Sequence, residues 1–231
     1  MVKRKLLVMT QKVKVSVIIT VAEDRGYLDV AIKSAIDQKF KNYEIILASD
    51  GNPEMKNYAD KYNLRFLLNK KGNAAKNANK ASKIAHGEFI KFLSDDDLLT
   101  PNCLMDLTAN IKDNALIFAN AIDFWANGKT ILRKPIMREN FKELLRLKSS
   151  YIHGGTIMFR KDVLFNCGGF DERLDSCEEY DFYLNLLSKG YKFTYLDKTV
   201  YRYRKHDKNK SRIACSPERM IDKNFIVSKY S

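Results

Sequence analysis

Long hydrophobic runs are missing from this 231-residue chain. No apolar run approaches the roughly 20 residues that a helix needs to span a bilayer. The N-terminal residues 1–12 begin with basic side chains, but their apolar part is far too short for a signal-peptide core. Repeats, low-complexity tracts and Pro/Gly-rich linkers are also absent. These absences predict a cytoplasmic protein built as one large domain or as two closely packed halves.

Cysteine is scarce as well. The four cysteines, Cys103, Cys167, Cys177 and Cys215, lie far apart and lack the paired spacing of a zinc site or a redox motif. We expect reduced thiols that mostly pack in the interior. The chain also lacks a Ser/His/Asp or Cys/His arrangement that would indicate an enzyme nucleophile.

Acidic residues are outnumbered, with 28 Asp and Glu against 41 Lys and Arg, which gives a formal net charge of +13. A lysine-rich solvated surface would explain this excess. An anionic partner would explain it equally well, and phosphates of a small substrate, a membrane surface and nucleic acid all qualify. Charge alone does not choose among these.

Apolar runs and helical periodicities alternate over the first hundred residues. Residues 15–19 ("VSVII") are typical of a buried strand, and residues 27–40 repeat apolar side chains at helical spacing. An alanine-faced helix from Ala74 is expected to stop near Gly87, a typical C-terminal cap. Further strands are expected at 44–48, 64–68 and 89–93. This order predicts a parallel sheet with helices on its faces and with ligands at the carboxyl ends of the strands.

The pattern changes after Pro101. We expect this second half to be mixed α/β and to cap the parallel half, with residues 213–231 as a C-terminal tail. The Asn-Gly pair in residues 124–132 indicates a tight hairpin. The other expected elements are helices at 101–112, 138–148 and 178–188 and strands at 116–119 and 151–160.

Carboxylates collect at two of the predicted strand ends. Asp50 follows the second strand, and Asp95, Asp96 and Asp97 follow the strand at 89–93. Mg²⁺ and Mn²⁺ take one or two carboxylates and complete their shell with water and substrate phosphates. The acids therefore predict metal or ribose binding. The alternative is that they only cap the helix that begins near Pro101.

Four segments, in this order, resemble the motifs of the inverting glycosyltransferase family 2, which has the GT-A fold. They are "VSVIIT" with "YLDVAIKSAIDQKFKNYEIILASDGN", then "GEFIKFLSDDDLLTP", "GGFDERLDSCEEYDFYLNLLSKG" and "YRYRKHDKNKS". The resemblance covers about residues 13–211. It implies a Rossmann-like, mostly parallel central sheet flanked by helices, with a mixed α/β acceptor side. It also implies one domain, 13–212, with a nucleotide-binding half at 13–100 and an acceptor half at 101–212.

The resemblance implies roles for individual residues. Asp50 would contact the base of the nucleotide, Asp95 the ribose, and Lys76 the diphosphate. Asp96 would bind Mn²⁺ or Mg²⁺, and Asp97 would either share the metal or support the loop. The resemblance implies three sets of site residues. The nucleotide sugar would be bound by Thr20, Ala22, Glu23, Asp50, Lys76, Asp95 and Arg204, and the metal by Asp96, Asp97 and His206. The catalytic residues would be Glu179, as general base, and Glu178.

The chain departs from the family pattern near the nucleotide. Ala22 stands where the family usually has an aromatic or similar residue, and Ser49 replaces the first Asp of an Asp-Asp-Gly-Ser turn. These positions leave the identity of the nucleotide open. The base is Glu179 instead of Asp. Glu178 and Glu179 could also be only the solvated first turn of a helix, where acids are favoured.

The resulting prediction is a metal-dependent inverting glycosyltransferase. It would move a sugar, from a UDP-sugar for preference, to a hydroxyl of a glycan or a lipid-linked acceptor in the synthesis of a surface polysaccharide or glycoconjugate. The basic N-terminus, the helix at 138–148 and the basic residues in 201–212 could contact a membrane peripherally. Nucleic acid is not expected as a partner. His153 with Gly154 and Gly155 could line the acceptor side.

Two other classes remain as alternatives. A nucleotidyltransferase acting on sugar phosphates would also use acidic metal ligands, but it should have a Gly-rich loop after the first strand, where "TVAEDRGYL" has one glycine. A non-catalytic basic module for nucleic acid or other anions would explain the charge. It would not explain acids at strand ends.

Overall fold

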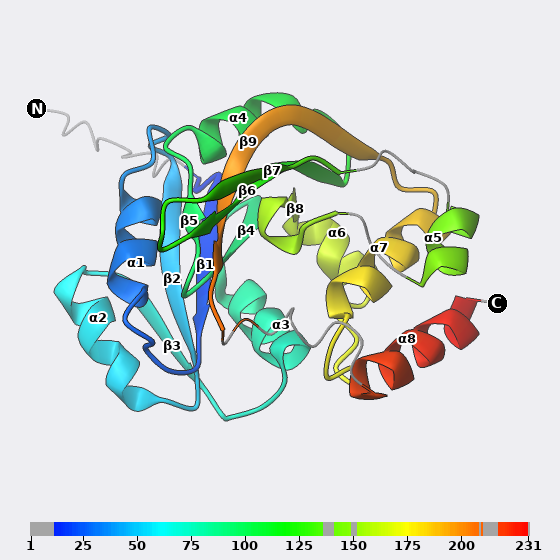
Figure 1. Cartoon of the computed structure of the whole chain (residues 1–231), viewed down its shortest axis with the longest axis horizontal. Helices are drawn as coiled ribbons and strands as arrows, with labels where there is room; N and C mark the ends of the chain where they lie inside the picture. The colour runs from blue at the N-terminus through cyan, green and yellow to red at the C-terminus, as the bar shows by residue number, and fades with distance from the viewer. Residues whose placement is uncertain (1–11, 136–140, 149–151, 208, 210–216, 231) are drawn as a thin grey trace, which may run out of the picture.

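A single curved sheet with helices on both faces forms the body of the molecule (Figure 1). The structure is a computed structural model that describes residues 12–135, 141–148, 152–207, 209 and 217–230. Within these ranges the sheet has nine strands. It is parallel in the first half of the chain and mixed in the second, which confirms the predicted α/β class.

The first half of the sheet has the strand order β3-β2-β1-β4, and every neighbouring pair is parallel. The continuous apolar run of β1 fits this central position, because a strand covered on both faces has no exposed side. The elements of this half are β1 (Val15–Val21), α1 (Leu28–Ile36), β2 (Tyr43–Asp50), η1 (Pro53–Met55), α2 (Lys56–Lys61), β3 (Arg65–Asn69), α3 (Ala74–Ile84) and β4 (Phe89–Ser94).

The second half adds antiparallel pairs and a return strand. β8 pairs antiparallel with β4, β6 pairs antiparallel with β8, and β9 runs parallel to β6. The elements are β5 (Leu98–Leu99), α4 (Cys103–Asn110), β6 (Leu116–Trp125), β7 (Thr130–Arg133), α5 (Phe141–Leu147), η2 (Gly154–Thr156), β8 (Met158–Arg160), α6 (Lys161–Asn166), α7 (Glu178–Ser188), β9 (Phe193–Lys205) and α8 (Pro217–Tyr230).

The long strand β9 brings the end of the domain back to the parallel strands. It arches along the sheet in Figure 1 and pairs with β6 over most of its length, with an irregularity at Asn120. Its later residues also pair antiparallel with β5, where Leu98 lies opposite Arg202. Because β5 follows the Asp95–Asp97 loop directly, this pairing places the end of β9 beside the acidic residues.

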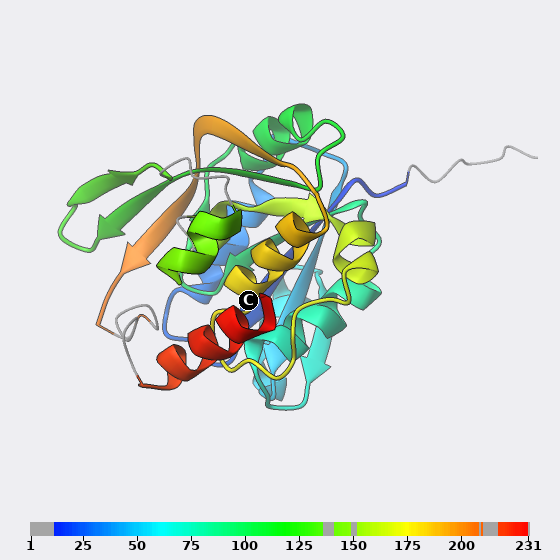
Figure 2. The same cartoon turned by 90° about the vertical axis from the view of Figure 1, so that its right-hand side faces the viewer.

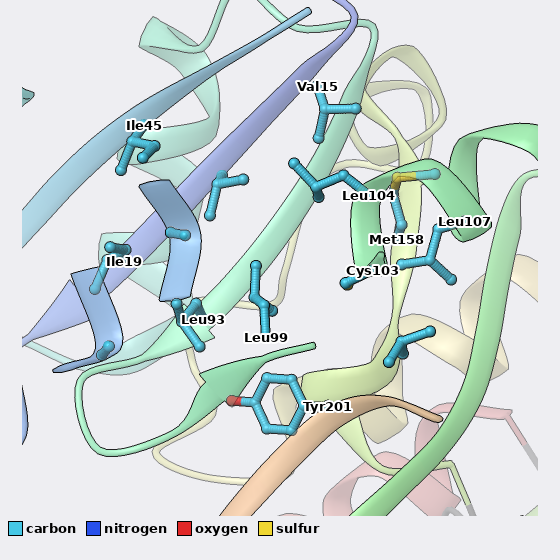
Figure 3. Close-up of a cluster of buried hydrophobic side chains, with 14 of the residues drawn as sticks. Val15, Ile19, Ile45, Leu93, Leu99, Cys103, Leu104, Leu107, Met158 and Tyr201 are labelled. Carbon is cyan, nitrogen blue, oxygen red and sulfur yellow. The ribbon is translucent and has the colours of Figure 1, made fainter. Parts of the chain in front are cut away.

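Side chains of β1 alternate between two cores. Val15, Val17 and Ile19 face a cluster built with α1 and α4, part of which Figure 3 shows. Ile18 faces a second cluster built with α3, α6 and α7. A third, smaller cluster joins α5, α7 and α8 and includes the fully buried Ile226. The helices of both halves therefore share the sheet, and the chain packs as one layered body.

Two local predictions need correction. The strand expected at 151–160 is only β8, preceded by the single turn η2, while Tyr151 lies outside the described residues. The helix expected at 138–148, in contrast, is confirmed as α5, and its predicted residues 138–140 lie outside the described residues. Residues 217–230 of the predicted tail form α8. No helix among the described residues is long and apolar enough to cross a membrane.

Gly87 does not cap α3 in the left-handed conformation that we expected. The helix ends at Ile84, Ala85 is extended, and Gly87 passes directly against the start of β1. Its N–H donates to Ser16 Oγ (2.8 Å), and a Cβ atom there would overlap the backbone of Val15 and Ser16. The glycine is needed for close approach of two chain segments.

We therefore expect Gly87→Ala to lower the free energy of unfolding by about 1–3 kcal/mol, because the added methyl group must displace backbone. Urea unfolding followed by circular dichroism measures this loss. Gly72→Ala is the matched control: an added Cβ there has its nearest neighbours at 3.6 and 3.8 Å. A loss in Gly72→Ala equal to that in Gly87→Ala would contradict the packing argument.

Candidate active site

A cleft of about 820 Å³ opens at the carboxyl ends of the parallel strands. The sheet register explains its position: Thr20 pairs with Ser94 and Val21 with Ser49, so the loops after β1, β2 and β4 leave the same edge. Residues of η2, α7 and β9 line it from the second half. The predicted site residues in its lining are Thr20, Ala22, Glu23, Asp50, Asp95, Asp96, Asp97, Glu178 and Glu179.

Three predicted residues are not part of this lining. Lys76 is exposed on the first turn of α3, so its contact with a diphosphate stays a prediction. Arg204 and His206 lie at the end of β9 and contact the acidic loop from behind. The structure thus brings these two to the carboxylates, although not to the lining of the cleft.

Arg25, in the loop after β1, neutralises part of the acidic loop. Its Nη2 atom lies 2.8 and 3.0 Å from the carboxylate oxygens of Asp95 and 3.2 Å from Asp96 Oδ2. Burial and the charge of Asp96 raise the pKa of Asp95, while Arg25 opposes that rise. The Arg25 guanidinium could exchange these carboxylate oxygens for the oxygens of a phosphate. Both groups accept a pair of hydrogen bonds from a guanidinium in a similar geometry.

Asp96 also contacts His206, at 3.0 Å between Oδ2 and Nε2. The imidazole ring of His206 packs against the ring of Tyr27, with centroids 5.4 Å apart. The backbone N–H of His206 donates to Asn209 Oδ1. Within the described ranges, no group of three or more His, Cys, Asp and Glu side chains is arranged to hold a metal ion. The protein could therefore supply Asp96 and His206, with the remaining ligands coming from substrate and water.

Both carboxylate oxygens of Asp97 are hydrogen-bonded to strand β9. Its Oδ2 accepts from the Tyr201 hydroxyl (2.8 Å) and its Oδ1 from the backbone N–H of Arg204 (2.7 Å), and only 1% of the residue is exposed. Burial and the charge of Asp96 raise the pKa of Asp97 to about 8. Of the two roles left open for Asp97, these contacts favour support of the loop.

Arg204 is held in place by stacking and by the acidic loop. Its guanidinium lies 4.4 Å from the ring centroid of Tyr27 and 4.6 Å from that of Phe124, and its Nε donates to the Asp96 carbonyl. Phe124 therefore packs against this arginine. The neighbouring Trp125 carries Lys129 over its ring.

Glu179 reaches the cleft from the first turn of α7. Its carboxylate lies against Gly154, so closely that a side chain at residue 154 would displace it from this position. The residue as a whole is exposed, because its side chain is open to the cleft, although many protein atoms lie around its carboxylate. This enclosure and the charge of Glu178 raise the pKa of Glu179, and the charges of Arg219 and Lys91 oppose the rise. A carboxylate with a raised pKa is a stronger base.

A lysine lies buried beneath this region. Lys91 of β4 is fully buried, donates to the carbonyls of Phe92 and Gly155, and lies under the ring of Tyr201 (5.0 Å). Burial lowers the pKa of Lys91 to about 8. Its bond to Gly155 fixes η2, the turn on which Glu179 rests. His153 accepts from Gly155 N–H in the same turn, so it stabilises the turn from inside.

Arg25, Lys91 and Tyr201 were missed by the sequence analysis. Arg25 follows the first strand at the edge where the acids collect, so its position offered a signal. The sequence around Lys91 and Tyr201 gave no such signal. Their hydrogen-bond partners, Gly155 and Asp97, are distant in the sequence and come close only in the folded sheet.

The chain belongs to glycosyl transferase family 2. The model of this family matches residues 16–167, which include the acidic loop and most of the parallel half. The match agrees with the resemblance of the sequence motifs and with the fold.

Two named relatives support this assignment, at 29% and 26% sequence identity. An uncharacterised glycosyltransferase of Rickettsia conorii is 29% identical over 189 residues, which cover 74% of this chain and 31% of that protein. The chondroitin synthase of Pasteurella multocida is 26% identical over 206 residues, which cover 85% of this chain and 21% of the synthase. The chain thus spans about a third or less of these relatives' length.

Solved structures share the fold. The 1–349 fragment of S. aureus TarS matches with a TM-score of 0.68 and 22% identity, covering 94% of this chain and 64% of that fragment. The complex of the same fragment with UDP-GlcNAc matches with a TM-score of 0.65 and 20% identity, covering 94% and 71%. These structures confirm the GT-A-like architecture.

The raised pKa of Asp97 predicts a pH-dependent stability. Between about pH 4 and 8 the folded protein keeps a proton on Asp97 that the unfolded chain releases, so stability falls as pH rises. Asp97→Asn should remove this part of the slope, at most about 1.4 kcal/mol per pH unit. Urea unfolding of both proteins at pH 5 and 7.5 measures it.

The exposed Asp113 provides the control, because Asp113→Asn makes the same substitution at the surface and should keep the wild-type slope. The rise in the pKa of Glu179 acts in the same direction in all three proteins and cancels in the comparison. Equal slopes in wild type and Asp97→Asn would show that Asp97 is ionised in the folded protein.

Proposed function

We propose that this chain is a metal-dependent inverting glycosyltransferase that moves a sugar from a nucleoside diphosphate to an acceptor hydroxyl. One observation carries the proposal: a carboxylate loop at the strand ends and Glu179 of α7 line the same cleft. An inverting transfer needs these two things together, a place for the diphosphate and a base on the acceptor side.

UDP is the nucleotide that we propose first. The S. aureus TarS fragment has been solved with UDP and with UDP-GlcNAc, and its fold is shared by 94% of this chain. Asp50 at the end of β2 and Asp95 at the end of β4 would contact the base and the ribose, with Thr20, Ala22 and Glu23 beside them. Asp50 is already oriented by the Gly72 N–H (2.9 Å).

The diphosphate would lie near Asp96, where Mn²⁺ or Mg²⁺ would be held by Asp96 and His206. These donors fit such an ion, because a hard cation accepts carboxylate and imidazole ligands and takes its other ligands from phosphates and water. When bound, the cation would neutralise charge on the departing diphosphate. Arg25 would bind the phosphates as it leaves Asp95, and Arg204 would hold the loop from behind.

Glu179 would take the proton of the attacking hydroxyl. Its position against Gly154 orients the carboxylate, and the enclosure that raises its pKa makes it a better base near neutral pH. Glu178 would tune that pKa through its own charge. No covalent intermediate is needed, since the hydroxyl attacks the anomeric carbon as the diphosphate leaves.

The acceptor that we propose is a glycan or a lipid-linked glycan of a surface polysaccharide or glycoconjugate. The names of two relatives, the chondroitin and hyaluronan synthases of Pasteurella multocida, support a polymeric product. Peripheral contact with the inner face of a membrane belongs to the same proposal. Most of the basic residues 1–12 and part of the helix expected at 138–148 lie outside the described residues.

Nucleotide binding is the first test. We expect UDP, titrated calorimetrically, to bind more tightly than GDP or dTDP and only with Mn²⁺ or Mg²⁺, so that EDTA abolishes the heat. Asp96→Ala should weaken binding at least about tenfold, because a buried metal ligand is lost. Lys83→Ala, which removes an exposed lysine in the last turn of α3 outside the cleft, serves as the control. Absence of binding by all three nucleotides would contradict the proposal.

The proposed base has its own test. Glu179→Gln should slow UDP release from UDP-GlcNAc, with water as acceptor, by about 10²–10⁴-fold, the usual share of general-base catalysis. UDP affinity should stay unchanged. In the wild type, the rate should fall as pH drops through the raised pKa of Glu179, because protonation removes the base. Glu178→Gln is the matched neighbour and should retain most of the rate. An equal loss in both variants would exclude Glu179 as the specific base.

A further inference from the structure

Helix α8 packs against the elements that carry Glu179. Figure 2 shows it crossing in front of α7. Ile226 is fully buried in a cluster with Leu174, Tyr180 and Leu184, which lie in α7 and just before it. Tyr230 at the end of α8 also donates to Asp181 Oδ1 (3.1 Å). The apolar face of α8 therefore covers the segment that leads into α7.

The chain between α6 and α7 is anchored at its first end by α3. Asn79 of α3 donates to the Phe170 carbonyl (2.9 Å) and accepts from the Phe170 N–H (2.9 Å). This reciprocal pair attaches Phe170 to a helix of the nucleotide-binding half. The residues between Phe170 and α7 need a second anchor if the start of α7, and with it Glu179, is to keep a fixed position in the cleft.

Asp222 of α8 supplies an anchor at the second end. Its Oδ2 accepts from both the backbone N–H (2.8 Å) and the hydroxyl (2.7 Å) of Ser176, two residues before Glu178. Both bonds use one oxygen atom. An asparagine whose side-chain oxygen took that place would therefore keep them both, whereas an alanine would keep neither.

The residue between Ser176 and α7 has a strained backbone. Cys177 has φ +62°, the left-handed conformation that is unfavourable for a residue with a side chain. Ser176 is held by Asp222 on one side, and the Cys177 Sγ lies 3.8 Å from Arg219 Nη2 on the other. Both partners belong to α8, so this helix maintains the turn that sets the start of α7.

Lys229 adds a third contact, further along α7. Its ammonium group lies 2.9 and 3.0 Å from the two oxygens of the buried Asp181 and 3.2 Å from Asp171. It thereby ties the first turn of α7 to the segment that follows Phe170. A buried carboxylate left without this cation would be costly, which keeps α8 in place.

We propose that α8 is a clamp that positions Glu179, with Asp222 and Lys229 as its positioning residues. This inference rests on the proposed function, because it assigns to α8 the alignment of the proposed base. Loss of Asp222 would free the Ser176 N–H and let Cys177 relax to an ordinary conformation. The first turn of α7 would then move, and a displacement of about 1 Å at a reacting group can cost about 100-fold in rate.

The test compares Asp222→Ala with Asp222→Asn in the full chain. Hydrogen exchange, read by mass spectrometry, should become at least about tenfold faster over residues 174–181 in the alanine variant and stay near wild type in the asparagine variant. The rate of UDP release from UDP-GlcNAc should fall about 10–100-fold in Asp222→Ala with KM nearly unchanged. Asp222→Asn should restore it.

A second pair guards against a variant that fails to fold. Lys229→Met should show the same exchange in 174–181 and the same fall in kcat, and Lys229→Arg should restore both, because a guanidinium can reach the two carboxylates. Unchanged exchange at 174–181 in both Asp222→Ala and Lys229→Met would overturn the clamp. So would an equal fall in kcat for Asp222→Ala and Asp222→Asn.

The two proposals fail in different ways. If the wild type neither binds UDP nor releases it from UDP-GlcNAc, the proposed function fails, while the exchange contrast between Asp222→Ala and Asp222→Asn still decides whether α8 holds the segment. If the wild type is active and the exchange contrast is missing, only the clamp fails. A loss of UDP affinity in Asp222→Ala would also overturn the clamp. The contacts that define the clamp join α8 to the segment that carries Glu179, and the nucleotide is proposed to bind at the acidic loop.

Discussion

The buried carboxylate of Asp97 joins the two halves of the domain at the site. It receives one hydrogen bond from the Tyr201 hydroxyl and one from the Arg204 backbone, both in β9, while its own backbone continues the loop after β4. Through these bonds the acidic loop is attached to the return strand that also carries the stacked Arg204. The anchored Asp97 thereby holds the loop on which Asp95 and Asp96 line the cleft.

Charge is balanced locally around this anchor. Arg25 pairs with Asp95 and Asp96 from the loop after β1, and Lys91 lies buried beneath Tyr201. Arg25 comes from the loop after β1 and Lys91 from inside β4, so the two cations reach this region from neighbouring strands. Of these two cations only Arg25 lines the cleft, so it is the one that an anionic donor would meet.

The acceptor side follows a different principle, since Glu179 is placed by packing and not by charge. Gly154 of η2 leaves room for its carboxylate, and Lys91 holds that turn through the Gly155 carbonyl. Enclosure then raises the pKa of Glu179, which suits a base. The two walls of the cleft therefore treat their carboxylates differently. On one wall Arg25 pairs with Asp95 and Asp96, and on the other desolvation raises the pKa of Glu179.

The amino-acid sequence by itself determined the parallel half, the edge where the acids meet, and α7, because period and strand order depend on local residues. It could not place Gly87, which looks like a helix cap until β1 passes against it. Nor could it assign Lys91, Tyr201 or Asp222, whose partners lie about 45 to more than 100 residues away along the chain. Only the tertiary structure decided these positions, because a buried polar side chain is defined by the distant groups that satisfy it.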